Sequence, residues 1–215
     1  MTDIKTEIIG TLLETIDDTH VWSQSEPKFF GPSTRTLSFF TDIDSTSALL
    51  LISQINHLAL TDPEEPITIH MNTEGGSFTD ALSIYDAIRN TPPPVICVAT
   101  GLCASGGLLI LAAADYKLAT ENTIFYYHEP VFSQSSSINS TKDMESLNGF
   151  YKFCQSTADA ILKEAMDISE RTWKKNFDSQ STGFYFDTNK ALKFKLIDKI
   201  AESNKVDFEF TEEGD

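Results

Sequence analysis

The sequence has little positive charge and no long apolar run. It holds 16 Lys and Arg against 32 Asp and Glu, for a net charge of −16. This excess of acid argues against nucleic acids and anionic membrane surfaces as partners. No apolar run approaches the ~20 residues that a membrane-spanning helix needs. The start, Met-Thr-Asp-Ile-Lys-Thr-Glu, lacks the basic and apolar blocks of a secretory signal, so we expect a cytoplasmic protein.

Cysteine is scarce as well. The three cysteines stand at positions 97, 103 and 154, and no C-x-x-C pair occurs. This spacing gives no support to a zinc ribbon or a thioredoxin-type redox site. An odd, unpaired set fits a reducing compartment. We interpret Cys97 and Cys103, which lie in apolar surroundings, as small core residues.

Strand and helix patterns alternate along the first two-thirds of the chain. Period-two alternation or short apolar runs indicate strands, and apolar spacings of three and four indicate helices. The connections have the length of parallel crossovers. We therefore predict an α/β fold of repeated strand–helix units, with no internal sequence repeat. The expected strands are 36–40, 67–72, 95–100, 116–119 and 123–127, and the expected helices follow Asp44, Ser77 and Ser105.

The flanking segments differ in character from this α/β core. Residues 1–35 have mixed polarity and read as a separate N-terminal segment, and 201–215 read as an acidic tail. A single apolar stripe over about 143–165 follows a polar connection and predicts a long helix. We expect this helix to project and pack against a partner subunit. The alternative is a helix that lies on its own sheet.

One stretch, Ala99–Ala114, carries a possible nucleophile, Ser105, among small residues. Small neighbours let the backbone approach a substrate closely. A helix that begins at Ser105 would direct free N–H groups at the site, which suits an oxyanion. The alternative is a strand-to-helix turn in which the serine is only an N-cap.

A histidine is the ordinary base for such a serine, because its neutral ring accepts a proton near pH 7. Of the four histidines, His20 lies in the N-terminal segment, His57 on an amphipathic helix and His70 within a strand. Only His128 follows a strand end, close to Pro130, which fixes the turn. We therefore select His128 as the candidate base.

Four stretches, in this order, resemble the proteolytic subunit of the Clp protease, a self-compartmentalising serine peptidase with a crotonase-like core. The resemblance runs from about Thr36 to Ile200. Met71–Ile88 is similar to the family's Asn-Ser-Pro-Gly-Gly segment and its following helix. Gly101–Gly107 is similar to the nucleophile motif, Tyr127–Pro130 to the histidine motif, and Lys195–Asp198 to the terminal Leu-Ile-Asp.

The resemblance implies a role for each matching residue. Ser105 would be the nucleophile, His128 the general base, and the N–H groups of Gly76 and Gly106 the oxyanion hole. It also implies a peptidase domain over 36–200 whose helix at about 143–165 is a projecting handle. Family members form two stacked seven-membered rings, a tetradecamer, fed with unfolded polypeptide by a hexameric AAA+ unfoldase. Such a serine endopeptidase needs no cofactor and no metal.

The sequence departs from the family at the third acid of the catalytic triad. That position is Gly183, and the carboxylates nearby in sequence are Asp187 and Asp178. Losing this acid costs ~10⁴ in kcat in a strict triad. If the glycine is not needed for a positive φ, Gly183→Asp is expected to raise turnover about tenfold or more. Two alternatives stay open: a weak or inactive structural subunit of a mixed ring, and an acyl-CoA hydratase or isomerase of crotonase architecture.

Overall fold

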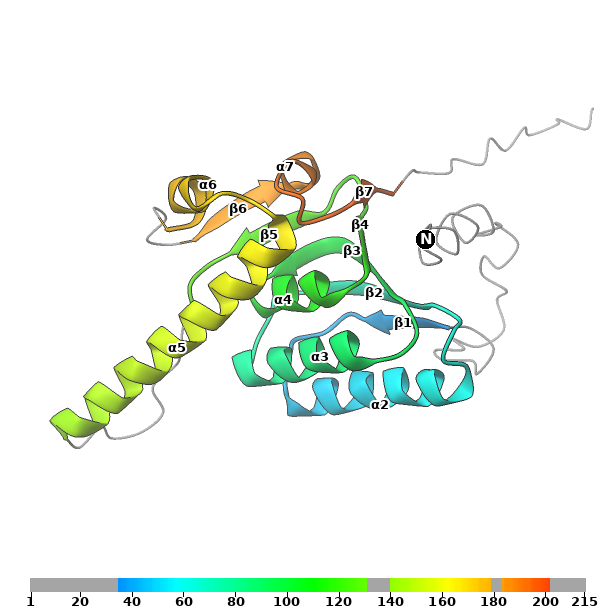
Figure 1. Ribbon diagram of the computed structural model, residues 1–215, viewed down its shortest axis with the longest axis horizontal. Helices are drawn as coiled ribbons and strands as arrows, with labels where there is room; N and C mark the ends of the chain where they lie inside the picture. The colour runs from blue at the N-terminus through cyan, green and yellow to red at the C-terminus, as the bar shows by residue number, and fades with distance from the viewer. Residues whose placement is uncertain (1–34, 131–139, 179–182, 202–215) are drawn as a thin grey trace, which may run out of the picture.

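A seven-stranded sheet organises the fold, which the computed structural model describes over residues 35–130, 140–178 and 183–201 (Figure 1). The order is β1-β2-β3-β4-β7, and β5 pairs with both β3 and β6. Every pairing is parallel except that of β5 with β6. The α/β prediction is confirmed. The strands are β1 (Thr36–Phe39), β2 (Ile67–Thr73), β3 (Val95–Ala104), β4 (Tyr116–Ala119), β5 (Ile124–Tyr127), β6 (Phe184–Asp187) and β7 (Lys199–Ile200).

Three helices, α2, α3 and α4, pack together against one face of the sheet (Figure 1). Side-chain capping begins two of them: Asp44 accepts hydrogen bonds from the N–H groups of Thr46 and Ser47, both at 2.8 Å, and Ser77 accepts one from the N–H of Asp80. The helices are α2 (Ser45–Thr61), α3 (Phe78–Asn90), α4 (Gly106–Ala113), α5 (Thr141–Met166), α6 (Glu170–Trp173), the π-helical η2 (Lys174–Asp178) and α7 (Thr188–Lys193).

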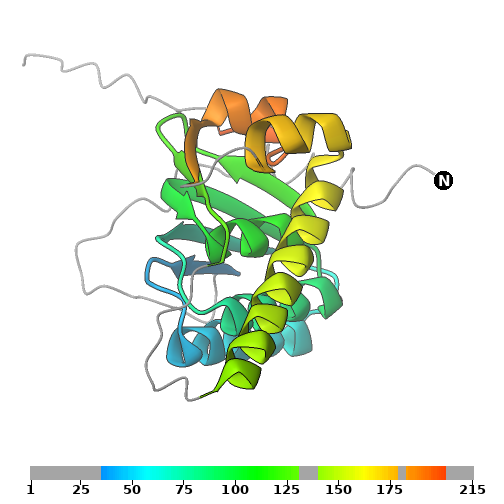
Figure 2. The same cartoon turned by 90° about the vertical axis from the view of Figure 1, so that its left-hand side faces the viewer.

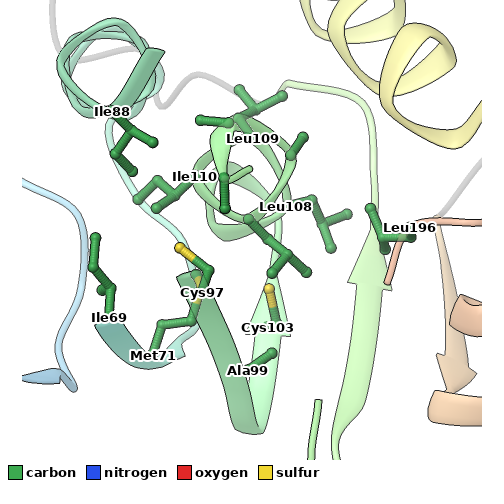
Figure 3. Close-up of a cluster of buried hydrophobic side chains, with 14 of the residues drawn as sticks. Ile69, Met71, Ile88, Cys97, Ala99, Cys103, Leu108, Leu109, Ile110 and Leu196 are labelled. Atoms are coloured by element: carbon green, nitrogen blue, oxygen red, sulfur yellow. The ribbon is translucent and has the colours of Figure 1, made fainter. Parts of the chain in front are cut away.

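The main core lies between the sheet and these helices (Figure 3). Alternation in β2 turns Ile67, Ile69 and Met71 inward, where all three are fully buried. Helix α4 is buried along its whole length, which explains why its sequence is apolar on every side. Because α4 starts directly after Ser105, this packing fixes the position of the candidate nucleophile.

Strand β3 changes partner along its length. Before Gly101 it pairs with β4, and after Gly101 it pairs with β5. Gly101 has a φ of +60°, and the Oδ1 atom of Asn72 accepts a hydrogen bond from the N–H of Leu102 at 3.0 Å. The strand predicted to end at residue 100 therefore continues to Ala104. Ser105 lies at the very end of a sheet strand.

Helix α5 extends away from the rest of the described chain (Figures 1 and 2). Its N-terminal half is largely exposed, and Cys154, Ala158, Leu162 and Met166 are buried against the body. The helix predicted for 143–165 is thus present, and its exposed half does not lie on the sheet. Large apolar side chains on that half include Phe153, which is 64% exposed.

Arg35, the last residue of the predicted N-terminal segment, is tied to the end of α2. Arg35 donates hydrogen bonds to the carbonyls of Leu58, Asp62, Glu65 and Pro66 at 2.6–3.1 Å. These bonds tie Arg35 to carbonyls at and beyond the end of α2. Residues 1–34, the polar run at 131–139 and the acidic segment from 202 onward lie outside the described residues.

Candidate active site

Three neighbouring strands deliver the predicted site residues to one place. Gly76 follows the carboxyl end of β2, Ser105 that of β3 and His128 that of β5. Parallel strands in α/β sheets commonly place ligand sites at this edge. Gly76, Ser105, Gly106 and His128 all line one cavity of about 620 Å³. The structure therefore brings together the serine, the histidine and the two glycines selected from the sequence.

Ser105 has a backbone conformation that is rare for a residue with a side chain. Its φ is +53°, and its N–H donates to the carbonyl of Tyr126 at 2.8 Å. It occupies the N-cap position of α4, yet its hydroxyl makes no capping hydrogen bond. Capping therefore does not account for the serine. Strained backbone of this kind clusters at functional sites.

The glycine pair before α3 lies directly against Ser105. A Cβ on Gly75 would lie 2.6 Å from the Cβ of Ser105, so only glycine permits this approach. Ile43 fixes the loop: its N–H donates to the Gly75 carbonyl, and its carbonyl accepts from Ser77, both at 2.8 Å. The N–H of Gly76 takes part in neither of these two hydrogen bonds. The N–H of Gly106, in the first turn of α4, also has no acceptor within its helix.

His128 is oriented by a backbone carbonyl. Its Nδ1 atom lies 2.6 Å from the carbonyl oxygen of Glu129. A carbonyl only accepts, so Nδ1 carries the proton and Nε2 is the basic nitrogen. Within the described part of the chain, no hydrogen bond joins His128 to the Ser105 hydroxyl. The two residues share the cavity without the direct contact of an assembled pair.

Gly183 lies beside His128, where the resemblance places the third acid. Tyr127 pairs with Phe184 in the β5–β6 ladder, and a Cβ on Gly183 would lie 2.7 Å from the Cβ of His128. That Cβ would also lie 2.5 Å from the carbonyl oxygen of Tyr127, and φ is +79°. The backbone here excludes a side chain. The condition attached to the Gly183→Asp expectation, that the glycine is not needed for a positive φ, is therefore not met.

Tyr126 occupies the space over Gly183. Its hydroxyl would lie 2.9 Å from a Cβ on Gly183, and its ring lies 5.3 Å from that of His128. Stacking on Tyr185 at 4.1 Å holds the ring in place. Tyr126 was not among the residues expected from the sequence, although residues i and i+2 of a strand share a face and β5 ends just before His128.

The structure does not bring Asp187 to His128. Asp187 pairs with Ile124 at the far end of β6, four residues and roughly 13 Å along the strand from Gly183. Its carboxylate accepts from the N–H of Lys190 at 2.8 Å and caps α7. Asp178 ends η2, and its side chain lies outside the described residues. Asp187 is thus an N-cap rather than the histidine's partner.

Helix α5 supplies part of the cavity wall and is tied to the strand that carries the histidine. The wall combines polar and apolar side chains. The hydroxyl of Tyr127 donates to Asp159 and accepts from Gln155, both at 3.0 Å. Burial, with the nearby Asp159 charge, raises the pKa of Tyr127, so its hydroxyl stays protonated. The apolar lining residues include Phe78, Leu109, Phe150, Ala158 and Leu162.

Two buried cysteines and the possible metal-ligating side chains are the alternative reactive groups. Burial raises the pKa of the Cys97 thiol to about 12 and also raises that of Cys103, so neither forms a thiolate near neutral pH. Across residues 35–130, 140–178 and 183–201, no three His, Cys, Asp or Glu side chains are grouped to hold a metal. No helix among them is long and apolar enough to cross a membrane.

Comparison with known proteins assigns the family. The Clp protease family model matches residues 32–204. ATP-dependent Clp protease proteolytic subunit 1 of Streptomyces avermitilis is 30% identical over 166 residues, 76% of this chain and 73% of the relative. The subunit 1 of Protochlamydia amoebophila is 28% identical over 176 residues, covering 77% and 80%. A ClpP1 mutant structure from Listeria monocytogenes has a TM-score of 0.69 at 24% identity, covering 79% and 92%. The chain therefore belongs to the Clp protease family.

Proposed function

We propose that this protein is a serine endopeptidase, the proteolytic subunit of an ATP-dependent Clp-type protease that degrades unfolded polypeptides. The observation that carries the proposal is that Ser105, His128 and two glycine N–H groups line one cavity at three adjacent strand ends. The apolar side chains on the α4 and α5 side of the cavity, among them Leu109 and Leu162, could accept an apolar substrate side chain. Membership of the Clp protease family supports the same activity.

The chemistry follows from these positions. As Ser105 Oγ attacks the scissile carbonyl, His128 Nε2 takes its proton. The N–H groups of Gly76 and Gly106 stabilise the oxyanion, each contributing ~3 kcal/mol in comparable enzymes. The imidazolium then protonates the leaving amine, and a water molecule hydrolyses the acyl-enzyme by the same route. The Glu129 carbonyl holds the tautomer that this sequence of steps requires.

A fluorophosphonate probe tests the proposal. The probe should label Ser105 at neutral pH, and Ser105→Ala should abolish both labelling and cleavage of a short fluorogenic peptide. Ser83→Ala is the matched control, because Ser83 lies on α3 and only hydrogen-bonds to its own helix. Equal labelling of the wild type and Ser105→Ala would refute the assignment.

A second function has a specific observation in its favour. Gly183 excludes the orienting acid, and the described residues form no Ser105–His128 hydrogen bond. These features fit a weak or inactive subunit that serves a structural role in a mixed ring. In that case the protein would assemble with a related subunit and only the partner would be labelled.

A ring assembly, an AAA+ unfoldase partner and a cytoplasmic location stay predictions.

A further inference from the structure

A second cavity, of about 660 Å³, is lined by residues of α6, η2 and α7 and shares no lining residue with the active-site cavity. Its lining is strongly basic: Arg171, Lys175, Lys190 and Lys193 face a single carboxylate, Asp187. That carboxylate is already engaged as the cap of α7. In a chain whose net charge is −16, this cavity is a local reversal of sign.

Charge compensation is incomplete among the cations that line this basic cavity. Arg171 and Lys193 form no ion pair with any residue in the described ranges. Lys190 lies 4.9 Å from the ring centre of Phe184 and 5.7 Å from that of Phe194, which fixes its ammonium group by cation–π contact. Like charges that converge in this way repel each other unless an anion neutralises them. The cavity therefore fits an occupant with several negative charges.

We propose that the basic cavity binds the acidic segment 207–215 of this same protein. This segment, Asp-Phe-Glu-Phe-Thr-Glu-Glu-Gly-Asp, has five carboxylates and no basic residue. Its tether begins close by: Ala201 follows β7, and β7 packs against α7 (Figure 1). The six residues from 201 to 207 span up to about 20 Å. Charge and reach thus select this segment over an unconnected anion.

The expected interaction is weak for each ion pair and gains from the tether. Exposed ion pairs contribute little individually, whereas a short linker gives the segment a high effective concentration at the cavity. Salt shortens the screening length, from about 10 Å at 0.1 M to about 3 Å at 1 M. Docking should therefore be favoured at low salt and lost at high salt.

A zero-length carbodiimide cross-linker tests this on the full-length protein, because it joins an amine to a carboxylate only in direct contact. Mass spectrometry should find cross-links from Lys175, Lys190 or Lys193 to residues 207–215. Lys152, exposed on the projecting α5, is the control amine and should give none. Cavity cross-links no more abundant than those of Lys152 would overturn the proposal.

A charge variant sharpens the result. Arg171→Gln removes a cation that cannot itself be cross-linked and adds no carboxylate, so it should lower cross-linking at Lys190 and Lys193 about fivefold, as should raising salt from 0.05 to 1 M. Lys152→Gln is the matched control and should change nothing. Unchanged yields in Arg171→Gln and in high salt would refute charge recognition. Mixing ¹⁴N- and ¹⁵N-labelled protein separates docking within a chain, which supports the proposal, from docking only between copies, which would overturn the tethered arrangement. None of these readouts depends on peptidase activity.

Discussion

Replacing Gly183 with aspartate adds the carboxylate that the Clp resemblance calls for at this position, and it also adds a Cβ. At a φ of +79°, a residue with a Cβ costs ~1–2 kcal/mol relative to glycine. The Cβ would lie 2.5 Å from the carbonyl oxygen of Tyr127, and relieving such overpacking costs ~1–3 kcal/mol. Together these penalties come to about 3 kcal/mol, which lowers the melting temperature of a chain of this size by roughly 6–12 °C.

The assay compares Gly183→Asp with Gly183→Ala, which adds the Cβ without the carboxylate. Both variants should melt earlier than the wild type by similar amounts in a thermal scan at fixed protein concentration. Neither should cleave a fluorogenic peptide faster, because a displaced β5 moves His128 away from Ser105. A Gly183→Asp protein with an unchanged melting temperature and faster turnover would refute this reasoning and restore the position to an acid.

Three further outcomes follow from the structure. Tyr126→Leu should lower kcat about tenfold with little change in KM. Tyr126→Phe keeps the ring beside His128 and should retain activity. Equal loss in both variants would contradict a positioning role for the ring. Burial lowers the pKa of His70, so the unfolded chain binds a proton that the folded chain does not, and stability should fall as pH drops below about 6.5; in thermal melts at pH 7.5 and 5.5, His70→Gln should reduce this loss. Leu147→Glu with Phe153→Glu on α5 should give smaller species in sedimentation velocity, and unchanged sedimentation would count against α5 as an assembly surface.

Hydrophobic periodicity was enough to predict β1 to β5 and α2 to α5, but not the short strands β6 and β7. The alternation of Ile67, Ile69 and Met71 and the cap at Asp44 are local signals, and each appears where it was expected. The site residues Ser105 and His128 were selected because each follows an apolar strand-like run. Because parallel strands end at the same edge of a sheet, these two residues lie in one cavity.

The features that the sequence did not reveal depend on contacts between distant segments. Whether Gly183 tolerates a side chain is decided by the Tyr127 carbonyl on another strand. Asp187 is close to Gly183 in the sequence, but the extended β6 carries it away from His128. Tyr126 can occupy its position near His128 because Gly183, just before β6, has no side chain. The sequence of β5 alone does not show this.

Because β3 changes partner at Gly101, the position of the Ser105 hydroxyl depends on the angle between the two parts of this strand. Ser105 lies four residues beyond Gly101, about 13 Å along an extended strand. A rotation of only ~5° at Gly101 would therefore carry the hydroxyl through about 1 Å, and displacements of that size can cost ~10²-fold in rate. The pairing with β5 limits this rotation on one side, and on the other the Asn72 side chain on Leu102 and the pairing of Thr73 with Cys103 limit it beyond the bend. Asn72 touches neither reacting group, yet it sets how far the catalytic end of β3 can swing.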